Sequence, residues 1–457
     1  MAKVTDLPNE IICNILDNVR PEDLESCTQI SKHVLRVCEP YLQRHRDLIR
    51  TYHKLIVPDF IHETPGNAVI CSKLPKVLRN VLLDNRLGFY VKTLVIINEE
   101  PDEVAEIEEE SEVQTQRSRL GPLQCIHLPG VDECTMVTEW LRGGGQDGFL
   151  PLLIPLLPGL TTLAIHWSFY DYGRLLDEIE YMISNPVSVL SNLVSVQLSA
   201  SYEVKILLKM VALFAALPSV RVLRAQQTQE QDLIWSDICQ RSNVAEIVLQ
   251  ESGLRPTKIC EMIQSFLQLE SFHYVLSSGH PSLRLEGQDF CSMRDMLLEC
   301  AGTTLRELSL TSRRQSERYV GSLRDFEVLE SLTIDWNALL PPAISERTLE
   351  KLLPASLRSL SIRETRQQNC EQCCQLFKAL NWAKSVKLRR LERITLILYK
   401  LKKLWGMTFF TNWKQELEKV GFNLETLSAE HYARRQRRHF FDHPTRGEFK
   451  FPKRPQH

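Results

Sequence analysis

A short apolar pattern recurs along the chain and sets the strongest limit on its fold. The pattern is a hexamer of the form apolar-x-x-apolar-x-apolar, as in LRELSL at residues 305–310. One hexamer alone is weak evidence, because 68 of the 457 residues are leucine, but a regular interval indicates one repeated structural unit. The hexamers begin at Val91, Leu123, Leu160, Leu193, Val220, Val244, Leu269, Leu305, Leu329, Leu357, Leu391 and Leu424.

The segments between the hexamers predict helices. A Leu-Pro pair stands just before three hexamers, at 157–158, 217–218 and 353–354, where proline ends a helix. Each unit is therefore a strand, a loop and a helix, and such units bury their apolar faces only when they stack. The sequence predicts an α/β fold, an irregular solenoid with a parallel sheet. A doubly wound α/β domain is the alternative, although twelve strands would be too many for one sheet of that kind.

Composition and charge narrow the class of protein. The chain carries 55 basic and 57 acidic residues, so its bulk charge does not favour binding to polyanions. The longest uncharged run, 148–170, is interrupted by Pro151, Pro155 and Pro158, and a membrane-spanning helix is not expected. No export signal is expected at the charged start, and the 13 cysteines lack the spacing of a disulfide framework. We therefore expect reduced thiols and a cytoplasmic or nuclear location, or both.

Residues 7–42 predict three short helices. After Pro8, apolar residues follow at helical spacing as far as Val19. A second helix is expected after Pro21, where acidic residues favour a first turn, and Ser31 is placed to cap a third. Helices of this size bury little surface alone, yet they carry more apolar positions than one internal seam needs. Either they pack as a cap on the rest of the chain, or an apolar face is left for a partner.

The order and spacing of this segment resemble the F-box. The matching positions are Leu7-Pro8, Glu10, Ile11-Ile12, Ile15-Leu16, Asp23-Leu24, Ile30-Ser31-Lys32, Leu35 and Pro40. In that family the module binds a Skp-type adaptor, which links it to a cullin and so to a ubiquitin-transfer machine. The resemblance implies that the adaptor would contact Leu7, Pro8, Ile11, Ile15, Leu16, Leu24 and Ile30.

A connecting helix is expected after the F-box-like segment. From Tyr41 to Ile56 the apolar residues fall on one helical face, and the pattern stops before Pro58. The expected organisation is an F-box over 1–42, a connecting helix over 43–58, a solenoid over 59–430 and a basic tail over 431–457.

The hexamer repeat resembles the leucine-rich repeat, in the irregular form found in cargo-reading F-box proteins of fungal type. The resemblance implies that the leucines point inward while the intervening positions line the exposed face of the sheet. That face would carry Thr162, Ala164, His166, Glu307, Ser309, Thr311, Ser331, Thr333, Asp335, Ser359, Ser361 and Arg363. Cargo contacts are expected from His166, Trp167, Tyr170, Asp335 and Arg363. The alternative for the aromatic residues is that they fold back over the side of the solenoid.

Other patterns favour structural or solvated roles. Nine carboxylates in residues 99–112 indicate a solvated loop, and the glycines at 143–148 lack the lysine of a phosphate loop. The single Cys-x-x-Cys at 370–373 has no second pair to complete a zinc site. The arginine-rich segment after residue 430 is either a solvated tail, a nuclear-import signal or a weak phosphate-binding patch. No catalytic string is found, and no cofactor or metal is expected.

The two resemblances together imply a substrate-recognition subunit of a Skp–cullin–F-box type ubiquitin ligase, and no catalytic residue is expected in this chain. Its expected partners are a Skp-type adaptor, a cullin through that adaptor, and an unidentified protein cargo, but neither a membrane nor nucleic acid. Its role would be to hold the cargo close to a ubiquitin-charged partner. The alternative is a leucine-rich-repeat scaffold with no ligase role.

Overall fold

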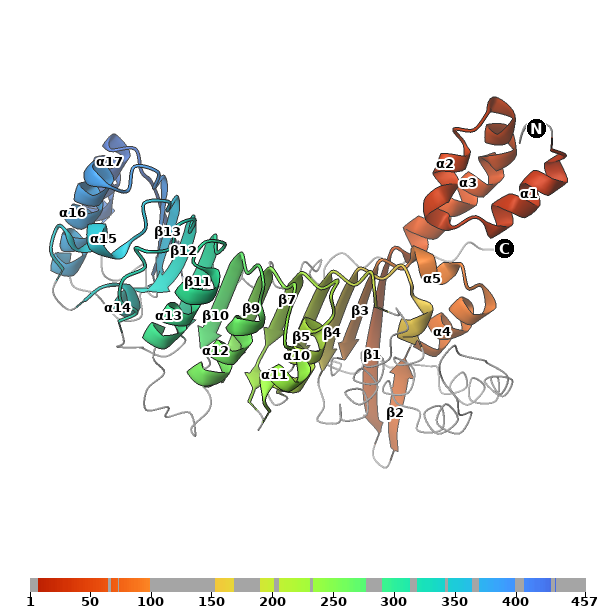
Figure 1. Cartoon of the computed structure of the whole chain (residues 1–457), viewed down its shortest axis with the longest axis horizontal. Helices are drawn as coiled ribbons and strands as arrows, with labels where there is room; N and C mark the ends of the chain where they lie inside the picture. The colour runs from red at the N-terminus through yellow and green to blue at the C-terminus, as the bar shows by residue number, and fades with distance from the viewer. Residues whose placement is uncertain are drawn as a thin grey trace. The chain divides into compact units, whose positions relative to one another are not determined.

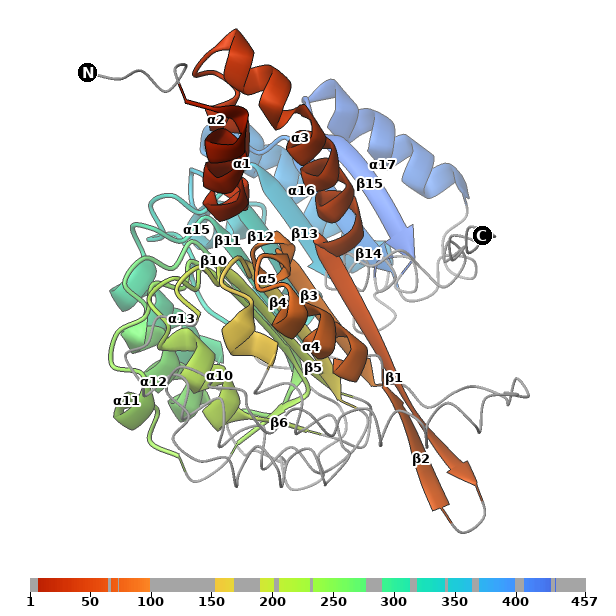
Figure 2. The ribbon, with the colours of Figure 1, turned by 90° about the vertical axis from the view of Figure 1, so that its right-hand side faces the viewer.

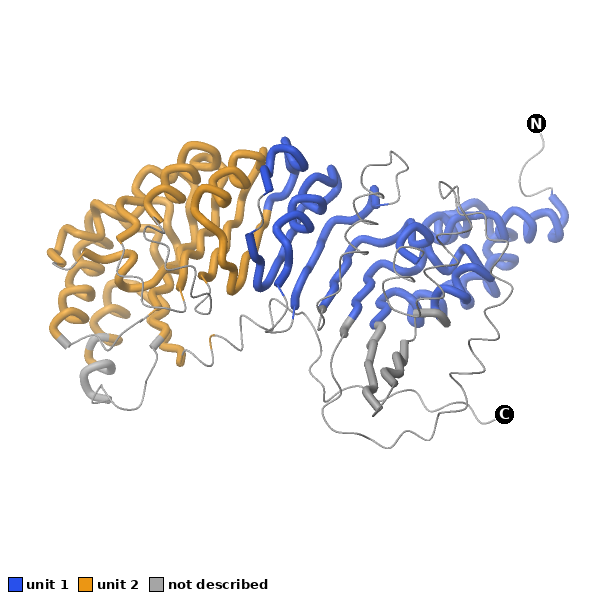
Figure 3. The backbone as a smooth tube through the Cα atoms, turned by 90° about the horizontal axis from the view of Figure 1, so that it is seen from below, with its two compact units in different colours: residues 1–245 blue, residues 246–457 orange. Residues whose placement is uncertain are grey.

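The computed structural model describes the chain in segments that form two compact units, residues 1–245 and 246–457 (Figure 3). Each unit combines parallel strands with helices, so the fold is α/β, as predicted. No described helix is long and apolar enough to cross a membrane. The described residues are 7–64, 67–72, 74–98, 153–167, 190–200, 205–230, 233–276, 290–312, 319–341, 344–363, 370–398, 407–428 and 432.

Unit 1 begins with the expected helical segments, which are α1 (Asn9–Asn18), the 3₁₀ turn η2 (Pro21–Asp23), α2 (Leu24–Cys27) and α3 (Lys32–Tyr52). Figure 2 shows α1 and α2 beside α3. The hydroxyl of Ser31 caps α3 by accepting a hydrogen bond from the Val34 amide at 3.1 Å. These helices share a core made of Ile12, Leu16, Leu24, Val34, Cys38 and Leu42.

Of the connecting helix predicted over 43–58, residues 43–52 are helical as the end of α3, whereas residues 54–58 are not helical. Helix α3 continues through Pro40, and the chain then enters strand β1 (Lys54–Thr64). An internal proline removes one backbone donor and normally disturbs a helix. Here Cys38 and Leu42, on either side of it, are both buried in the same core, and this packing holds the helix together across the proline.

The rest of unit 1 is a sheet with strand order β2-β1-β3-β4-β5-β7. Neighbouring strands are parallel except β2, which pairs antiparallel with β1. The further strands are β2 (Asn67–Ser72), β3 (Thr93–Asn98), β4 (Thr162–Trp167), β5 (Ser195–Ala200) and β7 (Val222–Gln226), with a small pair β6 (Ile206–Leu207) and β8 (Thr228–Gln229). The helices are α4 (Leu74–Leu83), α5 (Leu87–Tyr90), η4 (Ile154–Leu156), α10 (Leu208–Ala215) and α11 (Trp235–Ile238).

Unit 2 repeats a strand and a helix along the chain (Figure 1). Its strands pair in parallel with their neighbours in sequence order. They are β9 (Glu246–Ser252), β10 (Ser271–Leu276), β11 (Glu307–Ser312), β12 (Ser331–Asp335), β13 (Ser359–Arg363), β14 (Arg393–Leu398) and β15 (Asn423–Ser428). The helices are α12 (Pro256–Ser265), α13 (Phe290–Ala301), α14 (Trp336–Leu339), α15 (Thr348–Leu352), α16 (Cys370–Val386) and α17 (Met407–Lys419).

The hexamers account for the strands and for the core. From the hexamer at Val91 to the one at Leu391, each hexamer within the described residues has a strand that begins two residues after it, as β11 does after Leu305. The fourth hexamer positions then align across the sheet, and all of them are buried. In unit 1 this row is Leu94, Leu163, Val196 and Leu223, and in unit 2 it is Ile247, Phe272, Leu308, Leu332, Leu360, Ile394 and Leu424.

The hexamer predicted at Leu424 does not share the register of the others. Leu424 pairs with Ile394, which is a fourth position, so the predicted hexamer at Leu424 is three residues out of phase. The hexamer at Leu123 lies outside the described residues.

A row of small polar side chains also joins successive turns. At five of the hexamers, the residue immediately before the hexamer donates a side-chain hydrogen bond to a carbonyl of the preceding turn, over 2.8–3.1 Å. These bonds satisfy carbonyls that no strand or helix pairs. The donors are Asn192, Ser219, Asn243, Thr304 and Ser356, and the sequence analysis missed them.

Candidate interaction surfaces

Large apolar side chains are exposed on the N-terminal helices. Ile11 and Ile15 lie one turn apart on α1 and are 44% and 46% exposed. Ile30, which lies between α2 and α3, and Leu35, in the first turn of α3, are exposed to a similar degree. None of these residues belongs to the core that α1, α2 and α3 share. Exposed apolar side chains that lie together on a folded protein can form a surface that binds another protein.

The seven residues predicted to contact an adaptor separate into two groups. Pro8, Ile11, Ile15 and Ile30 are exposed, and Leu7 is half-buried against the core. The predictions for Leu16 and Leu24 are wrong, because each is only 1% exposed. Both side chains are core residues of the helices, with no surface left for a partner.

The N-terminal helices are joined to the sheet of unit 1 through α5 and the turn before it. Nδ1 of His45 on α3 lies 3.0 Å from the hydroxyl oxygen of Tyr90, and both side chains are buried. The guanidinium of Arg86 donates to the carbonyl oxygens of Asp17 and Val19, at 3.1 and 3.5 Å, where α1 ends. The end of α1 is thereby capped by a residue from the sheet side of unit 1.

On the sheet of unit 1, His166 lies where it was predicted. It is half-buried near the end of β4, and its Nδ1 lies 2.9 Å from Oγ of Ser199 on β5. Thr162 and Ala164 on the same strand are also half-buried. Trp167 ends β4, but its side chain and the whole of Tyr170 lie outside the described residues. Cargo binding by these residues stays a prediction.

The side chains of Asp335 and Arg363 form an ion pair. Nε of Arg363 lies 2.6 Å from Oδ1 of Asp335, and Nη2 of Arg363 lies 3.1 Å from Oδ2. The amide of Ser312 donates to Oδ2 of Asp335 at 2.7 Å, and Arg363 also donates to the Ser312 carbonyl. Burial raises the pKa of Asp335, while the Arg363 guanidinium opposes that shift. This network ties together the ends of β11, β12 and β13.

The prediction that Asp335 lines the exposed face of the sheet is therefore wrong. Its side chain is 0% exposed and its oxygens are taken by Arg363 and Ser312. Ser309 and Thr311, predicted on the same face, are also buried. At this point the sheet face is covered by its own polar side chains, and the Arg363 side chain pairs with Asp335 as part of that network.

A second polar cluster joins β10 to β11. Nε2 of His273 lies 2.8 Å from Oγ of Ser271 and 3.6 Å from Oε2 of Glu307. The hydrogen bond with His273 is the main cause that lowers the pKa of Glu307. One imidazole nitrogen faces both partners, whereas a hydrolytic triad uses the two nitrogens for different partners. The cluster therefore has the geometry of a cross-strand polar contact, and only Glu307 was singled out by the sequence.

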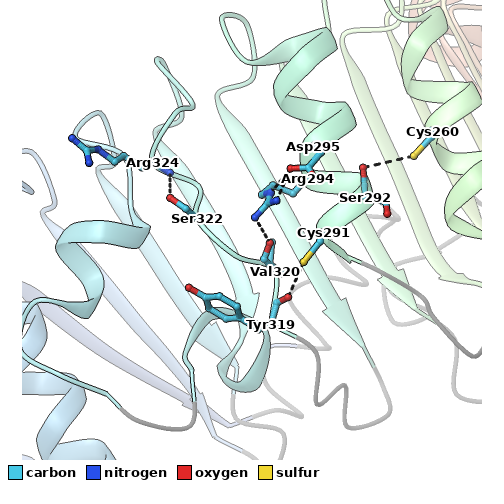
Figure 4. A network of polar contacts seen from close by, with 9 residues as sticks. All are labelled: Cys260, Cys291, Ser292, Arg294, Asp295, Tyr319, Val320, Ser322 and Arg324. Carbon is cyan, nitrogen blue, oxygen red and sulfur yellow. Dashed lines mark hydrogen bonds and ion pairs between the residues drawn. The ribbon is translucent and has the colours of Figure 1, made fainter.

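The described cysteines behave as packing residues. In Figure 4 the Cys260 thiol points to the carbonyl of Ser292 and the Cys291 thiol to that of Tyr319, at 3.8 and 3.1 Å. Burial raises the pKa of the Cys260 thiol, which disfavours the reactive thiolate. Within the Cys-x-x-Cys segment, Cys373 is buried. No group of metal-ligating side chains suited to an ion occurs among the described residues.

Comparison of the chain with protein-family models, with curated proteins and with solved structures found no match.

Proposed function

We propose that this chain is the substrate-recognition subunit of a Skp–cullin–F-box type ubiquitin ligase. In this proposal α1, α2 and the first half of α3 are an F-box that binds a Skp-type adaptor, and the strand–helix repeats are a leucine-rich-repeat solenoid that binds cargo. The observation that carries the proposal is the exposure of Ile11 and Ile15 on α1 and of Ile30 between α2 and α3, although these helices already have a complete core.

The exposed side chains are better suited to a protein partner than to an N-terminal cap. If the helices were only a cap, the isoleucines would be expected to face the sheet and be buried by it. Instead the contacts with the sheet side come from His45 and Arg86, and Ile11 and Ile15 stay in water. Burial of each isoleucine against an adaptor would contribute about 1 kcal/mol to binding.

The proposed mechanism is proximity. A receptor that fixes cargo beside a ubiquitin-charged partner raises the effective concentration of the reacting groups, and it needs no catalytic residue of its own. Contacts from Tyr90 to α3 and from Arg86 to α1 support this role, because they would hold the adaptor-binding helices steady on the first strands of the repeat. The proposed location is the cytoplasm, the nucleus or both.

The test is binding of the purified chain to a Skp-type adaptor by calorimetry. The double variant Ile11→Asp, Ile15→Asp should abolish measurable binding and keep its far-ultraviolet circular dichroism, because both side chains are exposed. Leu83→Asp is the matched control, since Leu83 is an exposed aliphatic residue of unit 1 outside the F-box helices. Failure of the wild type to bind, or equal binding by the double variant, would favour a scaffold with no ligase role.

A further inference from the structure

The exposed face of α16 carries two large apolar side chains, one turn apart. Trp382 is 36% exposed and Val386 is 45% exposed. Among the described residues of unit 2, the remaining large apolar side chain exposed to this degree is Leu267, which lies between α12 and β10. The rest of the apolar residues described on α16 face inward, as Leu376, Phe377 and Leu380 do. Trp382 and Val386 are therefore an apolar spot on an otherwise polar helix surface.

The indole of Trp382 is held in place by residues at α15, which packs beside α16 (Figure 1). Its Nε1–H donates to Oε2 of Glu350 at 3.2 Å. The guanidinium carbon of Arg347 lies 5.6 Å from the ring centroid, within range of a cation–π contact. A tryptophan that is already fixed loses little rotamer freedom when a partner binds. Fixed, exposed tryptophans are the residue type that most often anchors protein interfaces.

Basic side chains accompany this apolar spot. Lys378 lies one turn before Trp382 on α16, and Arg389 and Arg390 follow the end of the helix. These three side chains and Arg347 are exposed, and they form no ion pair with a carboxylate of the described residues. The surface made by Arg347, Lys378, Trp382, Val386 and Arg389 is called the α15–α16 surface below.

We propose that the α15–α16 surface binds an acidic, apolar-containing segment of the cargo protein. An apolar side chain of that segment would pack on Trp382 and Val386, and its carboxylates would pair with Lys378 and Arg389. Charge complementarity selects this occupant, because the basic side chains form no ion pair with a described carboxylate while the centre of the surface is apolar. Naming the occupant as cargo rests on the proposed function, whereas the binding itself does not.

The same observations disfavour a nucleic acid at this surface. Arg347 lies over the indole ring and so restricts the stacking of a base there. Val386 offers an aliphatic contact, which suits a Leu or Phe side chain better than a polynucleotide.

In the first experiment, a random dodecapeptide library displayed on phage is selected for binding to the full-length chain. No adaptor is present. The expected result is enrichment of peptides that combine Asp or Glu with Leu, Phe or Trp, on the wild type but not on Trp382→Ala. Enrichment of basic or uncharged peptides, no enrichment, or the same peptides on both proteins would overturn the proposal.

The second experiment measures the enriched peptide by fluorescence anisotropy. Trp382→Ala and the double variant Lys378→Glu, Arg389→Glu should each weaken binding at least about tenfold. Leu267→Ala is the matched control and should leave the affinity unchanged, because Leu267 is an exposed apolar residue between α12 and β10, outside the α15–α16 surface. Displacement of the peptide by oligothymidylate would reassign the surface to nucleic acid.

A third experiment observes Trp382 in the folded wild-type protein, so that its result does not depend on whether a variant folds. In 5-fluorotryptophan-labelled protein, the ¹⁹F resonance of Trp382, identified by its loss in Trp382→Phe, should shift on addition of the peptide. A shift confined to other tryptophans would contradict the proposal. If the wild type binds the peptide but not the adaptor, the proposed function alone is refuted. If it binds the adaptor but not the peptide, only the proposed role of the α15–α16 surface is refuted.

Discussion

His45 on α3 and Tyr90 on α5 form a buried polar pair, with Nδ1 of the imidazole 3.0 Å from the phenolic oxygen. Their ring centroids are 5.3 Å apart. Tyr90 lies just before β3, so the pair connects the N-terminal helices directly to the sheet of unit 1. A polar pair at such a junction gives it a defined geometry, because neither group can be left without a partner once it is buried.

The stability of unit 1 should depend on the protonation of His45. Burial lowers the pKa of His45, so the folded state holds it neutral, whereas the unfolded state takes up a proton near pH 6.5. The folded state is therefore fully stable with respect to His45 above about pH 6.5, and its free energy of unfolding declines as the pH falls toward the lower folded-state pKa of His45. Thermal unfolding of wild type and His45→Asn between about pH 7.5 and pH 5 tests this. Over that pH range, the melting temperature of the wild type should fall by more than that of the variant.

Tyr90→Phe should destabilise the chain by about 1–2 kcal/mol, because it leaves the buried His45 Nδ1 without its partner. Tyr52→Phe is the matched control, since Tyr52 is only half-buried near the end of α3. Urea unfolding followed by circular dichroism measures both variants. Equal effects of the two substitutions would show that the hydrogen bond at the junction contributes nothing specific.

Arg363→Met should be among the most damaging single changes in unit 2, with a loss of about 3–5 kcal/mol, because it leaves the Asp335 carboxylate buried without its cation. The defect should shrink at acidic pH, where protonation of Asp335 removes the uncompensated charge. Arg306→Met is the control: it breaks the exposed ion pair with Glu330, 3.3 Å long, and should change stability by less than about 1 kcal/mol. Denaturant titrations at neutral and acidic pH distinguish the two pairs.

The repeated strands could be predicted because their signal is local. An apolar hexamer specifies which side chains point inward, and the stacking of units then aligns Leu308 with Phe272 and Leu332. The polar residue before several hexamers was an equally local signal: Thr304 and Ser356 stand directly before Leu305 and Leu357. It was missed because serine and threonine are also common in ordinary turns.

The candidate site residues were harder to assign because their environment depends on distant parts of the chain. Helical spacing gives α1 two apolar rows, and only packing against α3 decides that Ile12 and Leu16 are buried while Ile11 and Ile15 are exposed. Asp335 and Arg363 are 28 positions apart, and only the register of β12 and β13 brings them together. Position on the outer face of a strand predicts exposure, but a long neighbouring side chain can cover that face.

Gly321→Ala should destabilise unit 2 more than Gly421→Ala. Both glycines have positive φ, +86° and +84°, so alanine carries a backbone penalty of about 1–2 kcal/mol at either position. At Gly321 the added Cβ would also lie 1.8 Å from Nη1 of Arg294, the group that donates to the Val320 carbonyl at 2.8 Å (Figure 4). At Gly421 nothing lies within 4 Å. The difference between the two melting temperatures therefore measures what the contact between Arg294 and the 319–322 segment contributes, and equal losses would show that it contributes nothing beyond the backbone penalty.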